Sequence, residues 1–393
     1  MFWRCRAALV VAFLLLLALP GPSLAKGPQI EARSWALIDA RSGDVLVSHA
    51  AGRHLPIAST TKLMTAYVVL HELPLDRVVR AAPYEAEYGE SLLGLRPGQR
   101  ISVRDLLYGL ILRSGNDAAY DLALAAAGSE QHFVAEMNRY AAALGLADTH
   151  YANPIGLDQR GNYSSAADLA TLTRHLLAIP AFAKIADARS AVLHSVHPQR
   201  RITTINELLR MAPWVTGVKT GHTFGALYVL VGSGQRKGIK LISVAVGAPT
   251  DEDRFSDNID LLDYGFSLYK RRVPIKAGAG LARPEIRYSG GELPLRAART
   301  VAVGMRRDQR MSVVVSAPDE VEGPIKRGAA LGRASVYVKG RRMASVPLRA
   351  AHAVAEASLL EQAGSFLDDE KIPVGIALCV ILVGVVLLRR FSR

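Results

Sequence analysis

The chain has 393 residues and 50% hydrophobic content, which is enough to build more than one folded domain. Its formal net charge is +13; five of these charges are arginines in the two hydrophobic ends, so residues 26–371 carry +8. An excess of this sign suits an anionic partner surface, but no basic–aromatic cluster indicates a nucleic-acid partner. Both cysteines, Cys5 and Cys379, lie in the ends, which excludes a disulfide, a thiolate metal site and a cysteine nucleophile from residues 26–371.

The first 25 residues predict a secretory signal peptide. Arg4 and Arg6 precede an apolar run at 7–19, and the small residues of Ser23-Leu-Ala25 suit a cleavage site. A retained N-terminal anchor is the alternative, which is disfavoured because a Pro-Gly-Pro break ends the apolar run just before the cleavage site.

An uncharged apolar run at residues 372–388 predicts a transmembrane helix near the other end. As a helix it would be about 25 Å long, slightly shorter than a bilayer core but workable with local thinning. The basic tail at 389–393 indicates a cytoplasmic C-terminus, so residues 26–371 would lie outside the cytoplasmic membrane. A core helix is the alternative. Residues 351–371 are predicted to form an amphipathic linker helix before the span.

Residues 26–274 are predicted to form one domain that mixes helices and strands. Short apolar, β-prone runs predict its strands at 34–39, 45–49, 214–220, 226–232 and 240–247. Helical spacing follows Ser59, fills most of residues 102–190, and returns at 254–269. A turn-rich segment at 153–165 predicts a long ordered loop. Because the helices lie between an N-terminal hairpin and C-terminal strands, both ends of the domain are expected to complete one sheet.

The pattern changes after Pro274, where short β-prone runs alternate with glycine-rich turns. These runs lie at 286–288, 300–305, 311–316, 334–339 and 343–348. They predict a small all-β domain over residues 275–350.

The first segment that carries chemistry is Ser59-Thr-Thr-Lys62, at the start of a predicted helix. Positions i and i+3 share a helix face, so the lysine ammonium can reach the serine hydroxyl. The positive end of the helix dipole would favour negative charge on Ser59, and Lys62 can act as a base if burial or a nearby cation lowers its pKa. Because Ser-x-x-Lys occurs three times in the chain, it is weak evidence alone, and by itself it favours a helix N-cap with a solvated lysine over a catalytic pair.

The second segment is Ser114-Gly-Asn116, between two apolar helical runs. Such a turn can aim a hydroxyl and a carboxamide at one point, and a helix N-cap is the alternative. Ser256-Asp-Asn258 has similar residues, but it lies inside a helical pattern. There, its serine and asparagine are expected to form an exposed polar face.

The third segment is Lys219-Thr220-Gly221-His222, on a predicted strand. Its small residues would let a ligand backbone approach closely, while Lys219 supplies a cation and Thr220 a hydroxyl. The alternative is an edge strand that a lysine protects from pairing with other chains.

The order of these segments, Ser-x-x-Lys, Ser-x-Asn and Lys-Thr-Gly, resembles the motif set of the penicillin-binding proteins and serine β-lactamases. With the predicted export and membrane anchor, the exported chain resembles the low-molecular-mass penicillin-binding proteins, the D-alanyl-D-alanine carboxypeptidases. The resemblance includes LILRSGNDAA, YANPIGLDQRGNYSSAADLA and GVKTGHT. It implies an α/β (α+β) fold, with a β-lactamase/transpeptidase-like antiparallel sheet flanked by helices, a mainly helical subdomain, a small all-β C-terminal domain and a C-terminal membrane helix.

The resemblance implies that the enzyme removes the terminal D-alanine of a peptidoglycan stem peptide through an acyl-enzyme on Ser59. Lys62 would be the base, and Ser114 would relay a proton to the leaving amine. The backbone N–H groups of Ser59 and His222 would form an oxyanion hole. The implied substrate-binding residues are Asn116, which would also hold Lys62, with Lys219, Thr220, Gly221, His222 and Arg254. Arg254 is alternatively a solvated arginine at a helix start.

The resemblance also implies partners and a location. The partners would be the peptidoglycan stem peptide, β-lactam antibiotics as covalent inhibitors, and the inner membrane. The protein would lie in the bacterial cell envelope, anchored by its C-terminal helix. The reaction needs no metal or cofactor, and His194 and His197 are predicted to be surface histidines because no third ligand is evident.

Two positions depart from the family pattern. Leu227 stands where glycine is expected, and Ile155 where histidine is common, which leaves the rate and the substrate range open. The alternative enzymes are a peptidoglycan DD-endopeptidase and a β-lactamase. Leu227 motivates an alternative of another class, a penicillin-binding scaffold with little turnover. A class A β-lactamase is disfavoured because the 153–165 loop lacks a glutamate.

Overall fold

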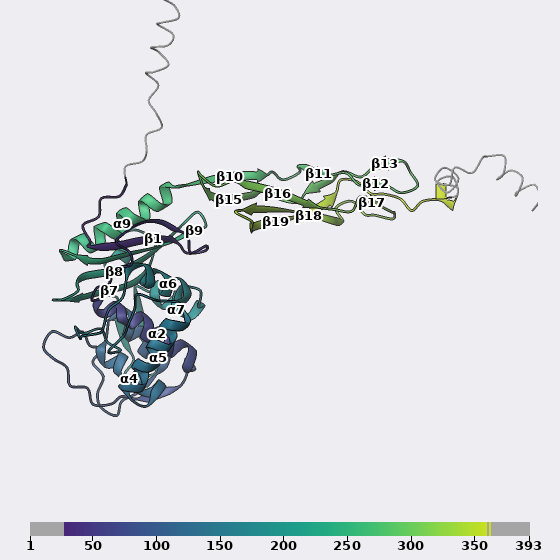
Figure 1. Cartoon of the computed structure of the whole chain (residues 1–393). Helices are drawn as coiled ribbons and strands as arrows, with labels where there is room; N and C mark the ends of the chain where they lie inside the picture. Colours follow the sequence, from purple (N-terminus) through teal and green to yellow (C-terminus); the bar gives the residue numbers. More distant parts are fainter. Residues whose placement is uncertain (1–26, 360, 363–393) are drawn as a thin grey trace, which may run out of the picture. The chain divides into compact units, whose positions relative to one another are not determined.

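The computed structural model describes residues 27–359, 361 and 362 of the chain (Figure 1). The chain divides into two compact units between Ser267 and Leu268. The predicted signal peptide, the predicted transmembrane helix at 372–388 and the basic tail at 389–393 lie outside the described residues. In the described part of the chain, no helix combines the length and the apolar character that crossing a membrane requires.

The first unit is organised around a five-stranded antiparallel sheet with the strand order β2-β1-β9-β8-β7. Its strands are β1 (Ser34–Asp39), β2 (Val45–His49), β7 (Val215–Thr223), β8 (Leu227–Arg236) and β9 (Ile239–Ala248). Strand β1 pairs with β9, so that Ala36 lies opposite Val244. This pairing joins the N-terminal hairpin to the C-terminal strands, which confirms that both ends of the domain complete one sheet.

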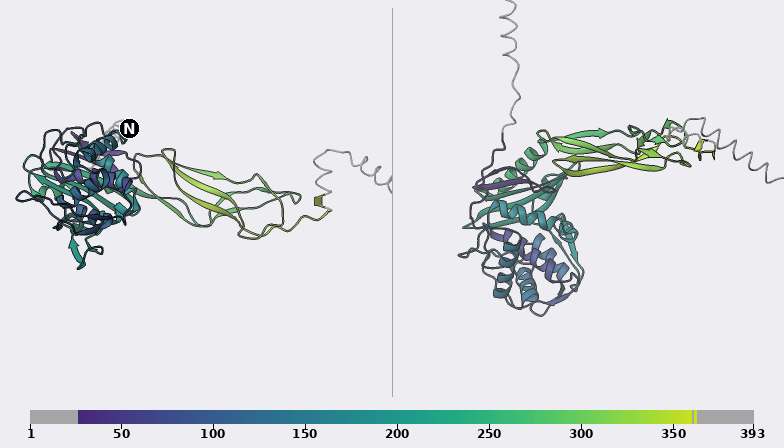
Figure 2. Two further views of the ribbon diagram at one scale, coloured as in Figure 1. Left: turned by 90° about the horizontal axis from the view of Figure 1, so that it is seen from below. Right: turned by 45° about the vertical axis from the view of Figure 1, so that its right-hand side comes forward.

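Helices cover both faces of this sheet. Helix α9 (Asp251–Ser267) lies on one face, while α2 (Lys62–Glu72) and α6 (Ala166–Leu177) lie on the other (Figure 1). The right-hand view of Figure 2 shows the same layering from another side. The other helices in the described part of this unit are η1 (Ala58–Thr61), α3 (Val103–Leu112), α4 (Asn116–Ala127), α5 (Glu130–Ala143), α7 (Pro180–Ala186) and α8 (Leu208–Met211). Two short strand pairs complete it: β3 (Val78–Arg80) with β4 (Arg100–Ser102), and β5 (Ser190–Leu193) with β6 (Arg200–Thr203).

Local sequence explains where several helices begin. The side chains of Ser102, Ser129 and Ser165 accept hydrogen bonds from backbone N–H groups in the first turns of α3, α5 and α6. Helix α2 lies inside the core, because every residue from Lys62 to Val69 is buried. The first residue of α2, a lysine, is therefore held inside the protein rather than in solvent.

Residues 269–350 of the second unit form β-strands and their connections, as predicted. Its main sheet has the strand order β11-β14-β19-β18-β16. The strands of the unit are β10 (Tyr269–Ile275), β11 (Gly280–Ala282), β12 (Glu285–Ile286), β13 (Gly291–Glu292), β14 (Leu295–Ala297), β15 (Val301–Arg306), β16 (Met311–Ser316), β17 (Glu320–Val321), β18 (Ala330–Val338) and β19 (Arg341–Ala350). A small core of its own, which includes Leu295, Val336 and Leu348, holds the unit together.

The boundary between the units differs from the predicted one at Pro274. Strand β10 begins at Tyr269 and pairs with β15 of the second unit, with Lys270 opposite Met305. The segment that sequence assigned to the end of the first domain therefore belongs to the second, because strand pairing outweighs the change in local composition.

The prediction of an amphipathic helix at 351–371 is wrong for the first part of that range. Residues 351–358 are not helical, and Val354 exchanges two backbone hydrogen bonds of 2.9 Å with Ile325. The N–H of Ala351 also donates to the Pro294 carbonyl at 3.0 Å. These bonds to the β domain satisfy the backbone groups that a helix would otherwise pair internally. The rest of the prediction lies almost wholly outside the described residues.

Candidate active site

Ser59 and Lys62 lie where the short helix η1 runs into α2. Lys62 Nζ donates a hydrogen bond of 3.0 Å to Ser59 Oγ and a second one to the backbone carbonyl of Ile155. Lys62 is fully buried, whereas Ser59 is partly exposed. Neither η1 nor α2 has a side-chain N-cap hydrogen bond, so the helix-cap interpretation of Ser59 is wrong. The solvated-lysine interpretation is wrong too.

The backbone around Ser59 is tightly enclosed. Ala58 has φ of 46°, a left-handed conformation that side chains disfavour. A Cβ on Gly156 would lie 2.1 Å from the Ala58 carbonyl oxygen, and one on Gly221 would lie 3.0 Å from the Ser59 nitrogen. Glycine at both positions thus lets the 153–165 loop and β7 pack directly against the Ala58–Ser59 backbone.

Ser114 and Lys219 form a second pair beside the first. Lys219 Nζ donates to Ser114 Oγ at 2.9 Å and to the Thr220 carbonyl at 2.7 Å. Ser114 has φ of 59° in the turn between α3 and α4. Strand β7 is the last strand of its sheet, but Lys219 is only 1% exposed. Lys219 is therefore not an exposed lysine that protects a sheet edge.

The two lysines lose their protons far more readily than lysines in water do. Burial lowers the pKa of Lys62 from its ordinary value of 10.5 to about 7, against the attraction of the Glu90 and Asp117 carboxylates. Burial also lowers the pKa of Lys219 well below its ordinary value, and the charges of Lys62 and Arg254 lower it further. Because the two amines interact, they titrate as a pair. Near neutral pH the site therefore offers a buried amine that can take a proton.

Asn116 lies next to this group but has a partner that the sequence did not predict. Its Nδ2 donates to Glu90 Oε2 at 2.6 Å. In the described part of the chain no hydrogen bond joins Asn116 to Lys62, so the expected direct contact is not formed. Glu90 lies in the irregular segment at 81–99, where no sequence pattern marks it. The carbonyl of Ile155 was missed as well, because backbone groups leave no signal in residue types.

Arg254 lies against β7 rather than in solvent. Its Nη1 donates to the Gly221 carbonyl at 3.0 Å, and its guanidinium pairs with Asp251. The guanidinium lies 5.2 Å from the ring centroid of Tyr228, which stacks on the His222 ring at 4.3 Å. The interpretation of Arg254 as a solvated helix-start arginine is therefore wrong. Thr220 is 4% exposed on the same strand.

Leu227 shows why a glycine is expected at its position. Its φ is 56°, in the left-handed region, where it begins β8 opposite Thr223 of β7. A glycine adopts this conformation without steric cost, whereas a leucine adopts it only with strain between its Cβ and the backbone.

The Ser256-Asp-Asn258 segment is structural. Ser256 is exposed on α9, as expected, but Asn258 is fully buried and accepts a hydrogen bond of 2.6 Å from Ser243 Oγ. The expectation of an exposed polar face is therefore wrong for Asn258, because this side of α9 packs on the sheet.

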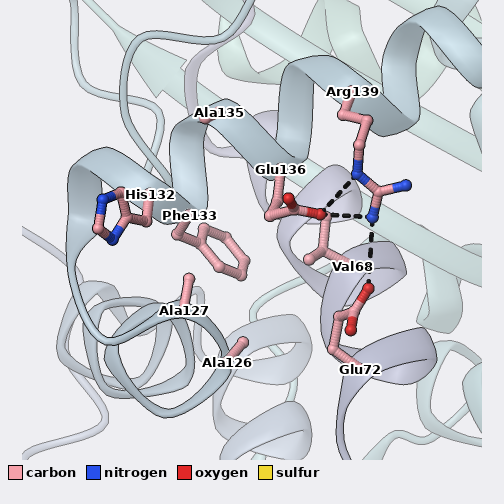
Figure 3. Close-up of a pocket in the computed structure, with 9 residues that line it drawn as sticks. All are labelled: Val68, Glu72, Ala126, Ala127, His132, Phe133, Ala135, Glu136 and Arg139. Carbon is pink, nitrogen blue, oxygen red and sulfur yellow. Dashed lines mark hydrogen bonds and ion pairs between the residues drawn. The ribbon is translucent and has the colours of Figure 1, made fainter.

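A separate pocket lies at the other end of α2 (Figure 3). Its lining residues come from α2, α4 and α5: Val68, Glu72, Ala126, Ala127, His132, Phe133, Ala135, Glu136 and Arg139. Arg139 pairs with both Glu136 and Glu72 on one side of it. None of the predicted site residues lines this pocket. His194 and His197 are both exposed, and within residues 27–359, 361 and 362 no cluster of three or more metal-binding side chains was found.

The α/β fold and the buried lysine on a partly exposed serine define a class, the penicillin-binding serine peptidases. Residues 22–250 match the family model of the D-alanyl-D-alanine carboxypeptidases, peptidase family S11. The chain belongs to this family, and its members are serine-type hydrolases. The resemblance that the motif order indicated is confirmed.

Individual relatives cover most of the chain. D-alanyl-D-alanine carboxypeptidase DacC of Escherichia coli (strain K12) is 33% identical over 344 residues, which span 82% of this chain and 84% of that protein. The crystal structure of DacD from Francisella tularensis matches with a TM-score of 0.62 and 25% identity, over 87% of this chain and 98% of that one. Penicillin binding protein 5 from Haemophilus influenzae matches with a TM-score of 0.59 and 28% identity, over 84% and 100% of the two chains.

Proposed function

We propose that this enzyme removes the terminal D-alanine from peptidoglycan stem pentapeptides through an acyl-enzyme on Ser59. One observation carries the assignment of the nucleophile. A fully buried lysine, with its pKa lowered to about 7, donates a hydrogen bond of 3.0 Å to a serine that remains partly exposed. A neutral Lys62 amine can take the hydroxyl proton as Ser59 attacks, which is what an activated nucleophile requires.

In the acylation step, Ser59 Oγ attacks the carbonyl carbon of the penultimate D-alanine while Lys62 Nζ takes the hydroxyl proton. The oxyanion is stabilised by the backbone N–H groups of Ser59 and His222. The amide bond then breaks, and the leaving D-alanine amine receives a proton relayed by Ser114. The contact of Ser114 Oγ with Lys219 Nζ at 2.9 Å supports this role, because the lysine keeps the relay hydroxyl oriented.

In the second step, water hydrolyses the ester on Ser59. Lys62 takes a proton from the water and returns one to Ser59 Oγ, which releases the shortened peptide and regenerates the enzyme. Tight packing of Gly156 and Gly221 on the backbone of Ser59 keeps the nucleophile in place through both steps.

The open edge of β7 supports a binding mode for the peptide. Because β7 is the last strand of its sheet, an extended stem peptide can add as a further strand along residues 219–222. Thr220 would donate to the terminal carboxylate, and Arg254 would attract it from behind the strand through its contact with Gly221. Asn116 would hold the substrate amide on the opposite side.

The same nucleophile would be acylated by β-lactam antibiotics. We also propose that the protein works in the bacterial cell envelope, exported by the signal peptide at 1–25 and anchored in the inner membrane by residues 372–388. The anchor is tested by carbonate extraction of membranes. The protein is expected to stay in the pellet, and release into the supernatant would argue for a peripheral attachment.

The reaction is tested by D-alanine release from a pentapeptide, paired with labelling by a fluorescent penicillin. Wild type should show both activities, and Ser59→Ala neither. Ser256→Ala is the matched control, because Ser256 belongs to the structural Ser-Asp-Asn segment and is expected to keep both. Release of D-alanine by Ser59→Ala at the wild-type rate would refute the assignment.

The same assays separate the alternatives. Labelling without D-alanine release would favour a penicillin-binding scaffold. Rapid turnover of the penicillin would favour a β-lactamase, and faster cleavage of cross-linked than of free peptides would favour a DD-endopeptidase.

A further inference from the structure

Glu90 is bound to the Ser114-Gly-Asn116 turn, and no step of the proposed reaction uses it. Its Oε2 accepts hydrogen bonds of 2.6 Å from both Asn116 Nδ2 and the Tyr84 hydroxyl. Its Oε1 accepts one of 3.0 Å from the Glu87 N–H. Burial raises the pKa of Glu90, but the hydrogen bonds from Asn116 and Tyr84 outweigh it and leave the pKa below its ordinary value. The carboxylate is therefore ionised at neutral pH.

The segment that carries Glu90 is held firmly against α4. The Asp117 carboxylate accepts backbone hydrogen bonds of 2.7 to 2.9 Å from residues 93–95. The backbone N–H of Asn116 donates to the Ser91 carbonyl at 2.8 Å. Because these bonds lie next to Glu90 in the chain, tertiary contacts hold its carboxylate beside the Asn116 side chain.

An ionised carboxylate decides which way the neighbouring amide faces. Glu90 can only accept, so Asn116 must present its amide nitrogen to Glu90. This leaves Oδ1 on the other side of the planar carboxamide, free to accept from a donor in the site. The proposed substrate amide is such a donor.

The same carboxylate places negative charge near Lys62. The charged groups that face Lys62 are Glu90 from the 81–99 segment, Asp117 from α4 and Lys219 from β7. Glu90 and Asp117 favour the ammonium form of Lys62, while burial opposes it. The charge of Lys62 in turn lowers the pKa of Lys219. Loss of the Glu90 charge would leave Asp117 as the one carboxylate of this set that favours the ammonium form. Lys62 would therefore lose its proton at lower pH.

We propose that Glu90 is a positioning residue for the acylation of Ser59. It orients Asn116 toward the substrate, and its charge sets the pH range in which Lys62 works as the base. This inference rests on the proposed function, so its test uses penicillin acylation of Ser59, which can be measured whether or not D-alanine is released.

The test measures the rate constant of acylation by a fluorescent penicillin against pH, using the full chain. Glu90→Gln keeps an acceptor for Asn116 but removes the charge, so the acidic limb of the profile should move to lower pH by about half a unit or more. Glu90→Ala removes both, and should add a loss of about tenfold or more in the rate at the optimum. Glu87→Gln is the matched control, because it removes the same charge from an exposed side chain of the same segment. Its profile should follow wild type.

A Glu90→Gln profile that superimposes on that of Glu87→Gln would overturn the inference, as would a Glu90→Ala rate equal to that of wild type. If Glu90→Ala fails to fold, the nearly isosteric Glu90→Gln still tests the inference, because the acidic limb of its pH profile either moves relative to the control or does not. D-alanine release is measured in parallel. Acylation without release in wild type would refute the proposed reaction, while the comparison of Glu90 variants by acylation would still hold.

Discussion

Replacement of Lys62 by methionine should make the protein inactive and change how its stability depends on pH. The pKa of Lys62 falls from 10.5 in an unfolded chain to about 7 in the folded one because the side chain is buried. At about 1.4 kcal/mol for each pH unit, the buried charge costs about 5 kcal/mol of folding stability below pH 7. Methionine has a similar volume and removes this cost, but it loses the hydrogen bonds to Ile155 and Ser59, worth about 1–3 kcal/mol.

The sign of the effect therefore depends on pH. Between pH 7 and 10.5 the unfolded wild type binds one proton more at this lysine than the folded one, so its stability rises with pH. Relative to Lys62→Met, wild type should gain about 1.4 kcal/mol for each pH unit in this range. The variant is expected to be about 2–4 kcal/mol more stable near pH 6 and less stable than wild type near pH 10.

Urea unfolding followed by tryptophan fluorescence measures this difference for the first unit alone. In residues 27–393 the tryptophans are Trp35 and Trp214, and both belong to that unit. Lys184→Met, which changes an exposed lysine on α7, is the control and should differ from wild type by the same amount at every pH. A difference for Lys62→Met that stays constant from pH 6 to 10 would refute the reasoning, because Lys62 would then keep an ordinary pKa in the folded protein.

Three further changes test the packing around the site. Gly156→Ala should abolish penicillin labelling and lower the free energy of unfolding by about 3 kcal/mol or more, because its Cβ would lie 2.1 Å from the Ala58 carbonyl oxygen. Gly145→Ala, also at positive φ but with nothing within 4 Å, should cost only about 1 kcal/mol and keep labelling; equal effects would contradict the clash. Leu227→Gly should raise the free energy of unfolding by about 0.5 kcal/mol in urea titration, since φ of 56° suits glycine, and a loss would show that the leucine packing matters more. Asp117→Ala should slow acylation at least about tenfold, because three loop N–H groups lose their acceptor; acylation at the wild-type rate would show that the loop holds without it.

Local pattern was sufficient for most of the fold. The two hairpins of the first unit, the strand with Lys219 and the β character of the second unit depend on short-range periodicity and turn residues, which act before any tertiary contact. Prediction failed where long-range pairing competes with local preference. Strand β10 joined β15 across the boundary expected at Pro274, and residues 351–358 bonded to the β domain although their composition suits a helix.

The candidate site divides in the same way. Ser59, Lys62, Ser114 and Lys219 stand in an ordered set of short segments, so residue types and spacing were enough to select them. The burial and the hydrogen-bond partners of these side chains could not be predicted from that order. The choice between a helix cap and a paired serine depended on the burial of Lys62, which only the packing of α2 inside the core decides.

The sequence by itself determined which side chains can do chemistry and the family to which they belong, because those properties reside in residue identity and order. The tertiary structure alone decided their state. It removed water from Lys62 and Lys219, and so lowered their pKa. It brought Glu90 and the Ile155 carbonyl to the site from segments without any motif, because contacts between distant parts of a chain follow from packing and not from local pattern.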